Sequence, residues 1–169
     1  MLAPIGGGRA YSSSAMLHIT PDDSRAEHAR ELLRALKVEL AERYGERVAF
    51  RRKGRDGEDP FAMFVVAWFG EQAVGCGALQ ALGPGLAQIK HLYVRPSHRN
   101  RGIGRELLAT LERHARRLGY RTLRLATGNL QPEAVAFYKS AGYQPIPPFG
   151  KYRRRKRSLC FEKTLPESE

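Results

Sequence analysis

The segment that most constrains the fold is residues 94–108, VRPSHRNRGIGRELL, where the character of the sequence changes twice. A strand-like apolar run ends at Val94, a basic loop follows, and Gly102 stands where a helix opens. A strand that leads through a short loop into an amphipathic helix indicates an α/β domain. The apolar residues that recur at helical spacing after the loop are Ile103, Leu107, Leu108, Leu111, Ala115 and Leu118.

The same loop has the features of an anion-binding site. The first N–H groups of a helix are unpaired and partially positive, and glycine lets an anion approach the backbone closely. Gly102 and Gly104 stand at this helix start, and Arg99, Arg101 and Arg105 surround it. The spacing is neither a Walker A loop nor the dinucleotide fingerprint with its third glycine. Taken alone, the pattern fits equally a phosphate-binding loop and a glycine-containing helix start with solvated arginines.

Charge is unevenly distributed along the 169 residues. Residues 1–89 hold 11 basic and 11 acidic side chains, whereas residues 90–169 hold 18 basic and 6 acidic ones, so the net charge of +12 belongs to the second half. This asymmetry predicts an anionic partner, which at this point is a nucleic acid, an acidic surface or a polyphosphate cofactor. No apolar run approaches the roughly 20 residues of a membrane span, which excludes an integral membrane protein.

The remaining pattern predicts alternating strands and helices without an internal repeat. A first helix is expected between Thr20, which would cap it in a capping box with Asp23, and Gly45, which would end it. We expect a mixed central sheet of about six to seven strands flanked by helices, with three strands forming an antiparallel meander. The strands are expected at residues 17–19, 61–69, 73–82, 86–94, 121–127, 143–146 and 158–163, and the later helices at residues 102–118 and 132–141.

Two segments fall outside this pattern. Residues 1–15 are rich in Gly and Ser and contain no acidic residue, so we expect a disordered leader followed by one domain over residues 16–169. Met1 and Met16 are both left open as the functional start. Residues 51–60, RRKGRDGEDP, are charged and turn-rich, and a loop is expected there.

Two motifs carry a resemblance to a known family. Arg99-x-x-Gly102-x-Gly104, after a strand that ends in Leu92-Tyr93-Val94, resembles the acetyl-CoA signature of the GNAT N-acetyltransferase superfamily. Residues 125–129, LATGN, and 133–146, EAVAFYKSAGYQPI, are similar to the second motif of that family. The resemblance covers roughly residues 60–165. It implies the GNAT fold, acetyl-CoA as cosubstrate and transfer of its acetyl group to a primary amine.

The resemblance also implies roles for individual residues. Backbone N–H groups at the helix start would bind the pyrophosphate of coenzyme A, and the end of the preceding strand would bind the pantetheine arm like an added strand. The Leu92 amide would polarise the thioester carbonyl. Tyr138 would serve the departing sulfur as an acid. The implied cofactor-binding residues are Leu92, Tyr93, Val94, Arg99, Asn100, Arg101, Gly102, Ile103, Gly104, Arg105, Asn129 and Tyr138.

The general base is where the sequence departs from the family pattern. Many relatives carry a glutamate where this chain has Gln88, and an amide cannot accept a proton at neutral pH. His91 on the same strand has a suitable ordinary pKa of about 6.5, but strand alternation predicts that it faces away from Gln88. Glu133 is interpreted as a helix N-terminal acid. Tyr138, apart from the motif, would be read as a core aromatic. The catalytic candidates are therefore Tyr138, Gln88 and His91.

The basic run at residues 151–157, KYRRRKR, leaves several partners open. It would attract an acidic acceptor, contact the 3′-phosphate of the coenzyme, bind nucleic acid, or remain a solvated loop. We expect no nucleic acid, since no recognised binding motif is present, and no metal, since no cluster has ligand spacing. Cys76 and Cys160 are expected in the core. We expect a cytoplasmic enzyme, with a homodimer left open; the alternative is a non-catalytic acyl-CoA-binding or nucleic-acid-associated module on the same fold.

Overall fold

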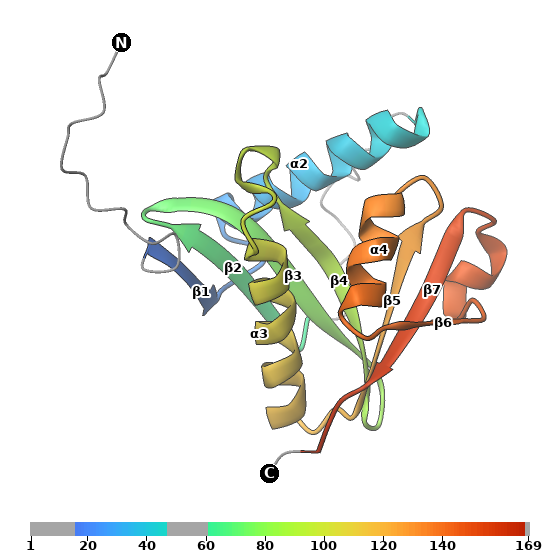
Figure 1. The fold of residues 1–169 in the computed structure, drawn as a ribbon. Helices are drawn as coiled ribbons and strands as arrows, with labels where there is room; N and C mark the ends of the chain where they lie inside the picture. Colours follow the sequence, from blue (N-terminus) through green and yellow to red (C-terminus); the bar gives the residue numbers. More distant parts are fainter. Residues whose placement is uncertain (1–15, 47–60, 168–169) are drawn as a thin grey trace.

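The computed structural model describes residues 16–46 and 61–167, so the predicted leader at 1–15 and the predicted loop at 51–60 lie outside it. A seven-stranded sheet runs through the molecule in the order β1-β2-β3-β4-β5-β7-β6 (Figure 1). The strands are β1 (Leu17–Pro21), β2 (Met63–Phe69), β3 (Gln72–Gly83), β4 (Leu86–Val94), β5 (Thr122–Gly128), β6 (Gln144–Ile146) and β7 (Ser158–Thr164). The helices are α2 (Glu27–Tyr44), α3 (Ile103–Arg117) and α4 (Pro132–Ser140), with short 3-10 helices η1 (Pro96–His98) and η2 (Gly150–Arg154).

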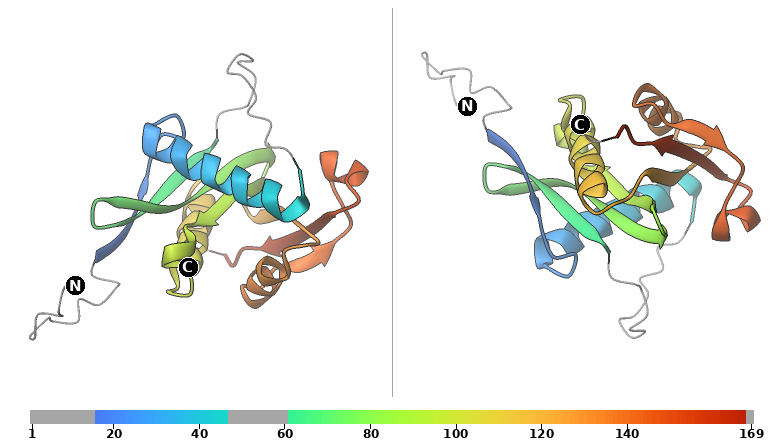
Figure 2. Two further views of the ribbon diagram at one scale, coloured as in Figure 1. Left: turned by 90° about the horizontal axis from the view of Figure 1, so that it is seen from above. Right: turned by 90° about the horizontal axis from the view of Figure 1, so that it is seen from below.

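Helices cover both faces of the sheet. Figure 2 shows α2 on one face and α3 and α4 on the other. The larger core lies beneath α3 and α4, where Leu107, Leu111 and Leu123 are fully buried. The smaller core lies beneath α2, around Leu32 and Cys76. The predicted α/β fold with a mixed sheet and an antiparallel β2–β3–β4 meander is thus confirmed, and among the described strands only β4 and β5 pair in parallel.

The start of the first helix differs from the sequence prediction. Thr20 does not cap a helix; it lies in β1 opposite Val66, and its hydroxyl accepts a hydrogen bond from the Trp68 indole at 3.1 Å. The helix begins at Glu27, after a turn in which Asp23 accepts a hydrogen bond from the Arg25 N–H at 2.8 Å. The capping-box prediction was wrong because edge-strand pairing with β2 extends the backbone through the proposed cap.

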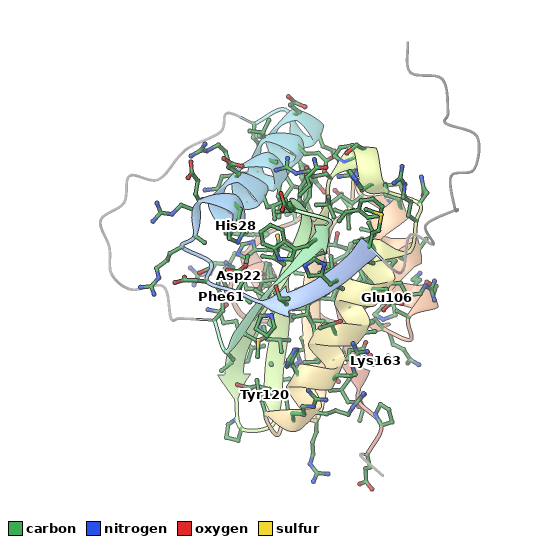
Figure 3. All side chains as sticks on the ribbon, turned by 90° about the vertical axis from the view of Figure 1, so that its left-hand side faces the viewer. Asp22, His28, Phe61, Glu106, Tyr120 and Lys163 are labelled. Carbon is green, nitrogen blue, oxygen red and sulfur yellow. The ribbon has the colours of Figure 1, made fainter. Side chains whose placement is uncertain are left out.

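A contact between Asp22 and His28 stabilises the turn that precedes α2. The Asp22 carboxylate and the His28 ring lie side by side at the start of α2 (Figure 3), with 2.7 Å between Oδ2 and Nε2. The Asp22 N–H donates to the Phe64 carbonyl at 2.8 Å. The first turn of α2 is thereby fastened to β2, which sets the helix across its face of the sheet.

A β-bulge interrupts β4 and changes which way His91 faces. Lys90 pairs with Ala78 and Tyr93 with Cys76, so two residues of β4, His91 and Leu92, fall opposite the single residue between those partners. His91 has a φ of 56°, and the Cys76 thiol donates to its carbonyl at 3.3 Å.

The bulge places the His91 ring on the α2 side of the sheet. The ring lies edge-on against Phe61, 5.5 Å between centroids, and Phe61 packs into the α2-side core. Gln88 faces the same side, because its neighbours Ala87 and Ile89 both enter the opposite core. The prediction that His91 faces away from Gln88 was therefore wrong, because the extra residue of the bulge interrupts the alternation of side chains between the two faces of the sheet.

Both cysteines are buried, as predicted from their place in strands. Cys76 is fully buried and Cys160 is 3% exposed. Burial raises the pKa of the Cys76 thiol to about 12. Both side chains therefore act as small packing groups in the sheet.

The close packing of β3 against β4 yields a test of the fold. A Cβ added at Gly75 would lie 2.7 Å from the Tyr93 carbonyl oxygen, which is backbone and cannot rotate away. We expect Gly75→Ala to lower the free energy of unfolding by about 1–3 kcal/mol, measured by urea denaturation.

The matched control is Gly83→Ala at the far end of the same strand, where a Cβ would meet nothing within 4 Å. Its free energy of unfolding should change by less than about 1 kcal/mol. Equal effects of the two substitutions would contradict the packing argument.

Candidate active site

Strands β4 and β5 separate soon after they meet. Their parallel pairing joins only Leu86–Gln88 to Thr122–Arg124, although β4 runs on to Val94 and β5 to Gly128. Figure 1 shows the two strands diverging, with α4 beside their separated ends. Residues 89–94 of β4 consequently have no strand partner on this side within the described chain. An exposed strand edge of this kind can bind an extended ligand through backbone hydrogen bonds.

The separated end of β4 leads into a row of unpaired backbone donors. The N–H groups of residues 100–105 find no partner within residues 16–46 and 61–167. Gly102 is the N-cap of α3 with a φ of 82°, and no side chain caps the helix. Asn100 also has a positive φ, 62°. Consecutive free N–H groups at a helix start, flanked by exposed Arg101 and Arg105, are suited to an anion such as a pyrophosphate.

The Arg99 guanidinium binds partners other than an anion at the N–H groups of residues 100–105. Its guanidinium pairs with Glu39 of α2 at 2.8 Å and donates from Nε to the Val94 carbonyl at 2.9 Å. It also lies over the Tyr93 ring, 5.6 Å from the centroid. The hydrogen bond that its guanidinium donates to the Glu39 carboxylate raises the pKa of Arg99. Arg99 therefore fastens the loop to α2. Of the three arginines predicted to surround the helix start, Arg101 and Arg105 remain without such a partner among the described residues.

Tyr138 comes from α4, on the same side of the sheet as α3. A Cβ added at Gly104 would lie 3.7 Å from Phe137, so α4 packs beside the first turn of α3. The Tyr138 ring lies edge-on to those of Phe137 and Tyr143, with centroids 5.2 and 5.9 Å apart. Burial raises the pKa of Tyr138, so its hydroxyl stays protonated at neutral pH. Among the described residues that hydroxyl has no hydrogen-bond partner.

The neighbouring Tyr143 differs in this respect. Its hydroxyl donates to Glu112 at 3.0 Å, and Lys163 donates to both oxygens of the same carboxylate at 3.0 and 3.1 Å. Burial, together with Glu112, raises the pKa of Tyr143. Of these two tyrosines, only Tyr143 has a hydrogen-bond partner for its hydroxyl among the described residues.

Gln88 stands at the last paired position, on the α2 face of the sheet. It is 5% exposed, and its Nε2 donates to the Tyr152 hydroxyl oxygen at 2.8 Å. Arg124 lies beside it on β5 and pairs with Glu162 of β7 at 2.7 Å. A polar row thus crosses the sheet where β4 and β5 part. Sequence reasoning missed Tyr152; its signal was an aromatic residue inside the basic run.

The last turn of α2 reaches the end of β5. The Tyr44 hydroxyl accepts a hydrogen bond from the Leu130 N–H at 3.2 Å, and it occupies the space that a Cβ on Gly128 would need. Arg43 pairs with Glu133 and thereby lowers its pKa. Glu133 thus has a structural partner at the start of α4, consistent with its interpretation as a helix N-terminal acid.

The remaining predicted residues have the following places. Asn129 is exposed just beyond β5, and its N–H donates to the Arg157 carbonyl at 2.8 Å. Ile103 is buried in the larger core. Within the described residues, no three His, Cys, Asp or Glu side chains come together as a metal site. No helix of this part of the chain is long and apolar enough to span a membrane.

Comparisons with known proteins agree with this geometry. The acetyltransferase (GNAT) family matches residues 23–143. The IAA acetyltransferase of Azospirillum brasilense is 37% identical over 107 residues, which are 63% of this chain and 70% of that relative. An acyl-CoA N-acyltransferase structure from Klebsiella pneumoniae has a TM-score of 0.75 at 30% identity and covers 89% of this chain and 99% of its own. A GNAT family acetyltransferase from Elizabethkingia anophelis, solved with acetyl-CoA bound, has a TM-score of 0.66 at 18% identity over the same shares.

The family match includes the separated end of β4, the unpaired donors at the start of α3 and the whole of α4. The family resemblance seen in the two motifs is confirmed by this match and by the shared fold. The chain belongs to the acetyltransferase (GNAT) family.

Proposed function

We propose that this protein transfers the acetyl group of acetyl-CoA to a primary amine by direct attack in a ternary complex. The observation that carries the proposal is the unpaired edge of β4, which leads directly into the free N–H row of residues 100–105. That row would hold the pyrophosphate, and the backbone N–H groups of Leu92 and Val94 would hold the pantetheine arm, since the Tyr93 carbonyl faces β3 and the Val94 carbonyl accepts from Arg99. A relative of the same fold has acetyl-CoA bound, which supports this assignment.

The two faces of the sheet would then receive the two substrates. Tyr138 lies on the α3 and α4 side, whereas Gln88 and Tyr152 lie on the α2 side, and the separation of β4 from β5 joins them. The coenzyme would occupy the first side and the amine the second. Direct attack needs no covalent enzyme intermediate, and both cysteines are buried away from such a role.

Two groups would stabilise the charge that develops in transfer. The Leu92 N–H would donate to the carbonyl oxygen as it becomes negative. The Tyr138 hydroxyl, protonated and without another partner among the described residues, would donate its proton to the departing thiolate.

The amine must lose a proton before it can attack. For a lysine-like amine with a pKa near 10.4, deprotonation at pH 7 costs roughly 4.6 kcal/mol. Gln88 cannot accept that proton, so its role is to position the amine or a water through its contact with Tyr152. His91 remains a candidate base, since the bulge brings its ring to the acceptor side. A cytoplasmic location remains part of this proposal.

The acid role of Tyr138 is tested by Tyr138→Phe. We expect kcat for thiol release from acetyl-CoA to fall about 100-fold across a panel of amine acceptors, because the proton donor is lost. The dissociation constant for acetyl-CoA should change little.

Tyr120→Phe is the matched control, since Tyr120 is a half-buried tyrosine at the opposite end of α3. Its kcat should equal that of the wild-type protein. Undiminished turnover in Tyr138→Phe would remove this residue from the mechanism.

The anion site is tested by Gly102→Ala, compared with Gly119→Ala. Both glycines have positive φ, 82° and 89°, and neither has a heavy atom within 4 Å of an added Cβ, so both substitutions strain the backbone similarly. Only Gly102 adjoins the N–H row. We expect Gly102→Ala to weaken acetyl-CoA binding about tenfold in calorimetry, a loss of about 1.4 kcal/mol, while Gly119→Ala binds normally. Equal affinities in the two variants would contradict the assignment.

The raised pKa of Tyr138 also predicts the shape of the pH–rate profile. An acid is active only while protonated, so a pKa above the ordinary value of about 10 extends activity toward alkaline pH. We expect kcat to rise with pH as the acceptor amine deprotonates and to show no fall due to Tyr138 below about pH 10. A descending limb below that pH that disappears in Tyr138→Phe would contradict the expectation.

A further inference from the structure

The segment that contains η2 carries an unusual concentration of positive charge. Residues 151–157, KYRRRKR, hold six basic side chains. No acidic residue occurs anywhere between Glu133 and Glu162. The sequence therefore supplies no local counter-charge, and the fold must bring one from elsewhere or leave the segment positive.

Within residues 16–46 and 61–167, the fold leaves this segment positive. None of the side chains from Arg153 to Arg157 forms an ion pair with residues 16–46 or 61–167. All five are exposed. Arg155 and Arg157 instead lie over the rings of Tyr152 and Tyr44, 5.8 and 5.7 Å from the centroids.

Other arginines around the site have acidic partners. Arg43 pairs with Glu133, Arg99 with Glu39, and Arg124 with Glu162. The carboxylates of Glu39, Glu133 and Glu162 are thus already engaged. The cations of residues 153–157 remain to be matched by a group from outside the described chain.

Their position identifies the side from which that group comes. Tyr152, inside the same segment, bonds to Gln88 at 2.8 Å, at the point where β4 and β5 part. Figure 2 shows residues 150–154 on the α2 side of the sheet, away from α3 and α4. These cations therefore border the acceptor side rather than the N–H row of residues 100–105.

On this basis, and resting on the acetyltransferase function proposed above, we propose that the acceptor is an amine that also carries a carboxylate or a phosphate. The guanidinium groups of residues 153–155 bind that oxyanion, for which their planar donor fork is suited. The amine then lies at Gln88 and Tyr152. A polyamine is disfavoured, because its charges repel those of η2 and the residues after it.

The test compares acceptors that differ only in the anionic group. One pair is 4-aminobutyrate and 4-aminobutyramide, and the other is O-phosphoethanolamine and ethanolamine; spermidine represents polycations. The readout is kcat/KM for thiol release from acetyl-CoA. We expect the anionic member of at least one pair to be favoured about tenfold, as for a charge-assisted hydrogen bond weakened by solvent. The pair that shows the preference distinguishes carboxylate from phosphate.

A triple variant assigns the preference to the segment. Arg153→Gln, Arg154→Gln and Arg155→Gln together should abolish the difference within the favoured pair, mainly through KM. The preference should also weaken as salt is raised from 50 to 500 mM, because screening acts on exposed charges.

The matched control removes the same number of exposed cations from the outer surfaces of two helices. It combines Arg30→Gln and Lys37→Gln on α2 with Arg117→Gln on α3; all three side chains are exposed, and none belongs to β4, β5 or η2. This variant should keep the preference of the wild-type protein.

Calorimetry of acetyl-CoA binding in every variant distinguishes the anionic-acceptor proposal from the acetyltransferase function on which it rests. Failure to bind acetyl-CoA would overturn the acetyltransferase function itself. Three results with normal acetyl-CoA binding would overturn the anionic-acceptor proposal alone. They are equal kcat/KM within both acceptor pairs, a preference for spermidine, and no turnover of any acceptor tested. A triple variant that loses acetyl-CoA affinity and keeps its acceptor preference would assign the cations to the coenzyme instead, which also overturns the proposal.

Discussion

The short parallel pairing of β4 with β5 is the constraint on which the rest of the site depends. Three residue pairs join the strands, and beyond Gln88 the backbone of β4 must find its hydrogen bonds elsewhere. The bulge at His91 lies in the free stretch and is bound by the Cys76 thiol. The two halves of the sheet would be weakly joined without further contacts. The last turn of α2 supplies these by binding Leu130 and Glu133 beyond the end of β5.

The charge asymmetry of the sequence resolves into two separate surfaces. Arg101 and Arg105 stand beside the helix start on the α3 side, next to N–H groups that have no partner among the described residues. The cations of residues 153–157 belong to and follow η2, which lies on the opposite, α2 side of the sheet (Figure 2). A single excess of positive charge, counted along the chain, is thus divided between two sides of the sheet, and we propose that each side receives its own anion. Only the folded topology separates the two groups of cations, because α3 and η2 lie on opposite faces of the sheet (Figure 2).

Local patterns predicted the central elements well, since the strand, loop and helix of residues 86–117 each follow a clear period and end at glycine or a polar run. The motifs placed Tyr138 and Gly102 on the correct elements for the same reason. The start of α2 could not be predicted, because Thr20 has good capping chemistry and loses it to pairing with β2. The bulge at His91 could not be predicted either, because no glycine or other turn residue marks it in the sequence of β4. The contact between Gln88 and Tyr152 joins residues 64 apart in sequence, so no local rule detects it.

The burial of both cysteines bears on redox chemistry. A thiol with a pKa of about 12 is present as thiolate to roughly one part in 100,000 at pH 7, and thiolate is the form that exchanges with disulfides. Cys160 is shielded from solvent, and the chain has no other cysteine. A protein that liberates a free thiol at every turnover therefore offers that thiol no partner on its own surface. An oxidising environment therefore finds no exposed cysteine thiol on this protein with which to form a mixed disulfide.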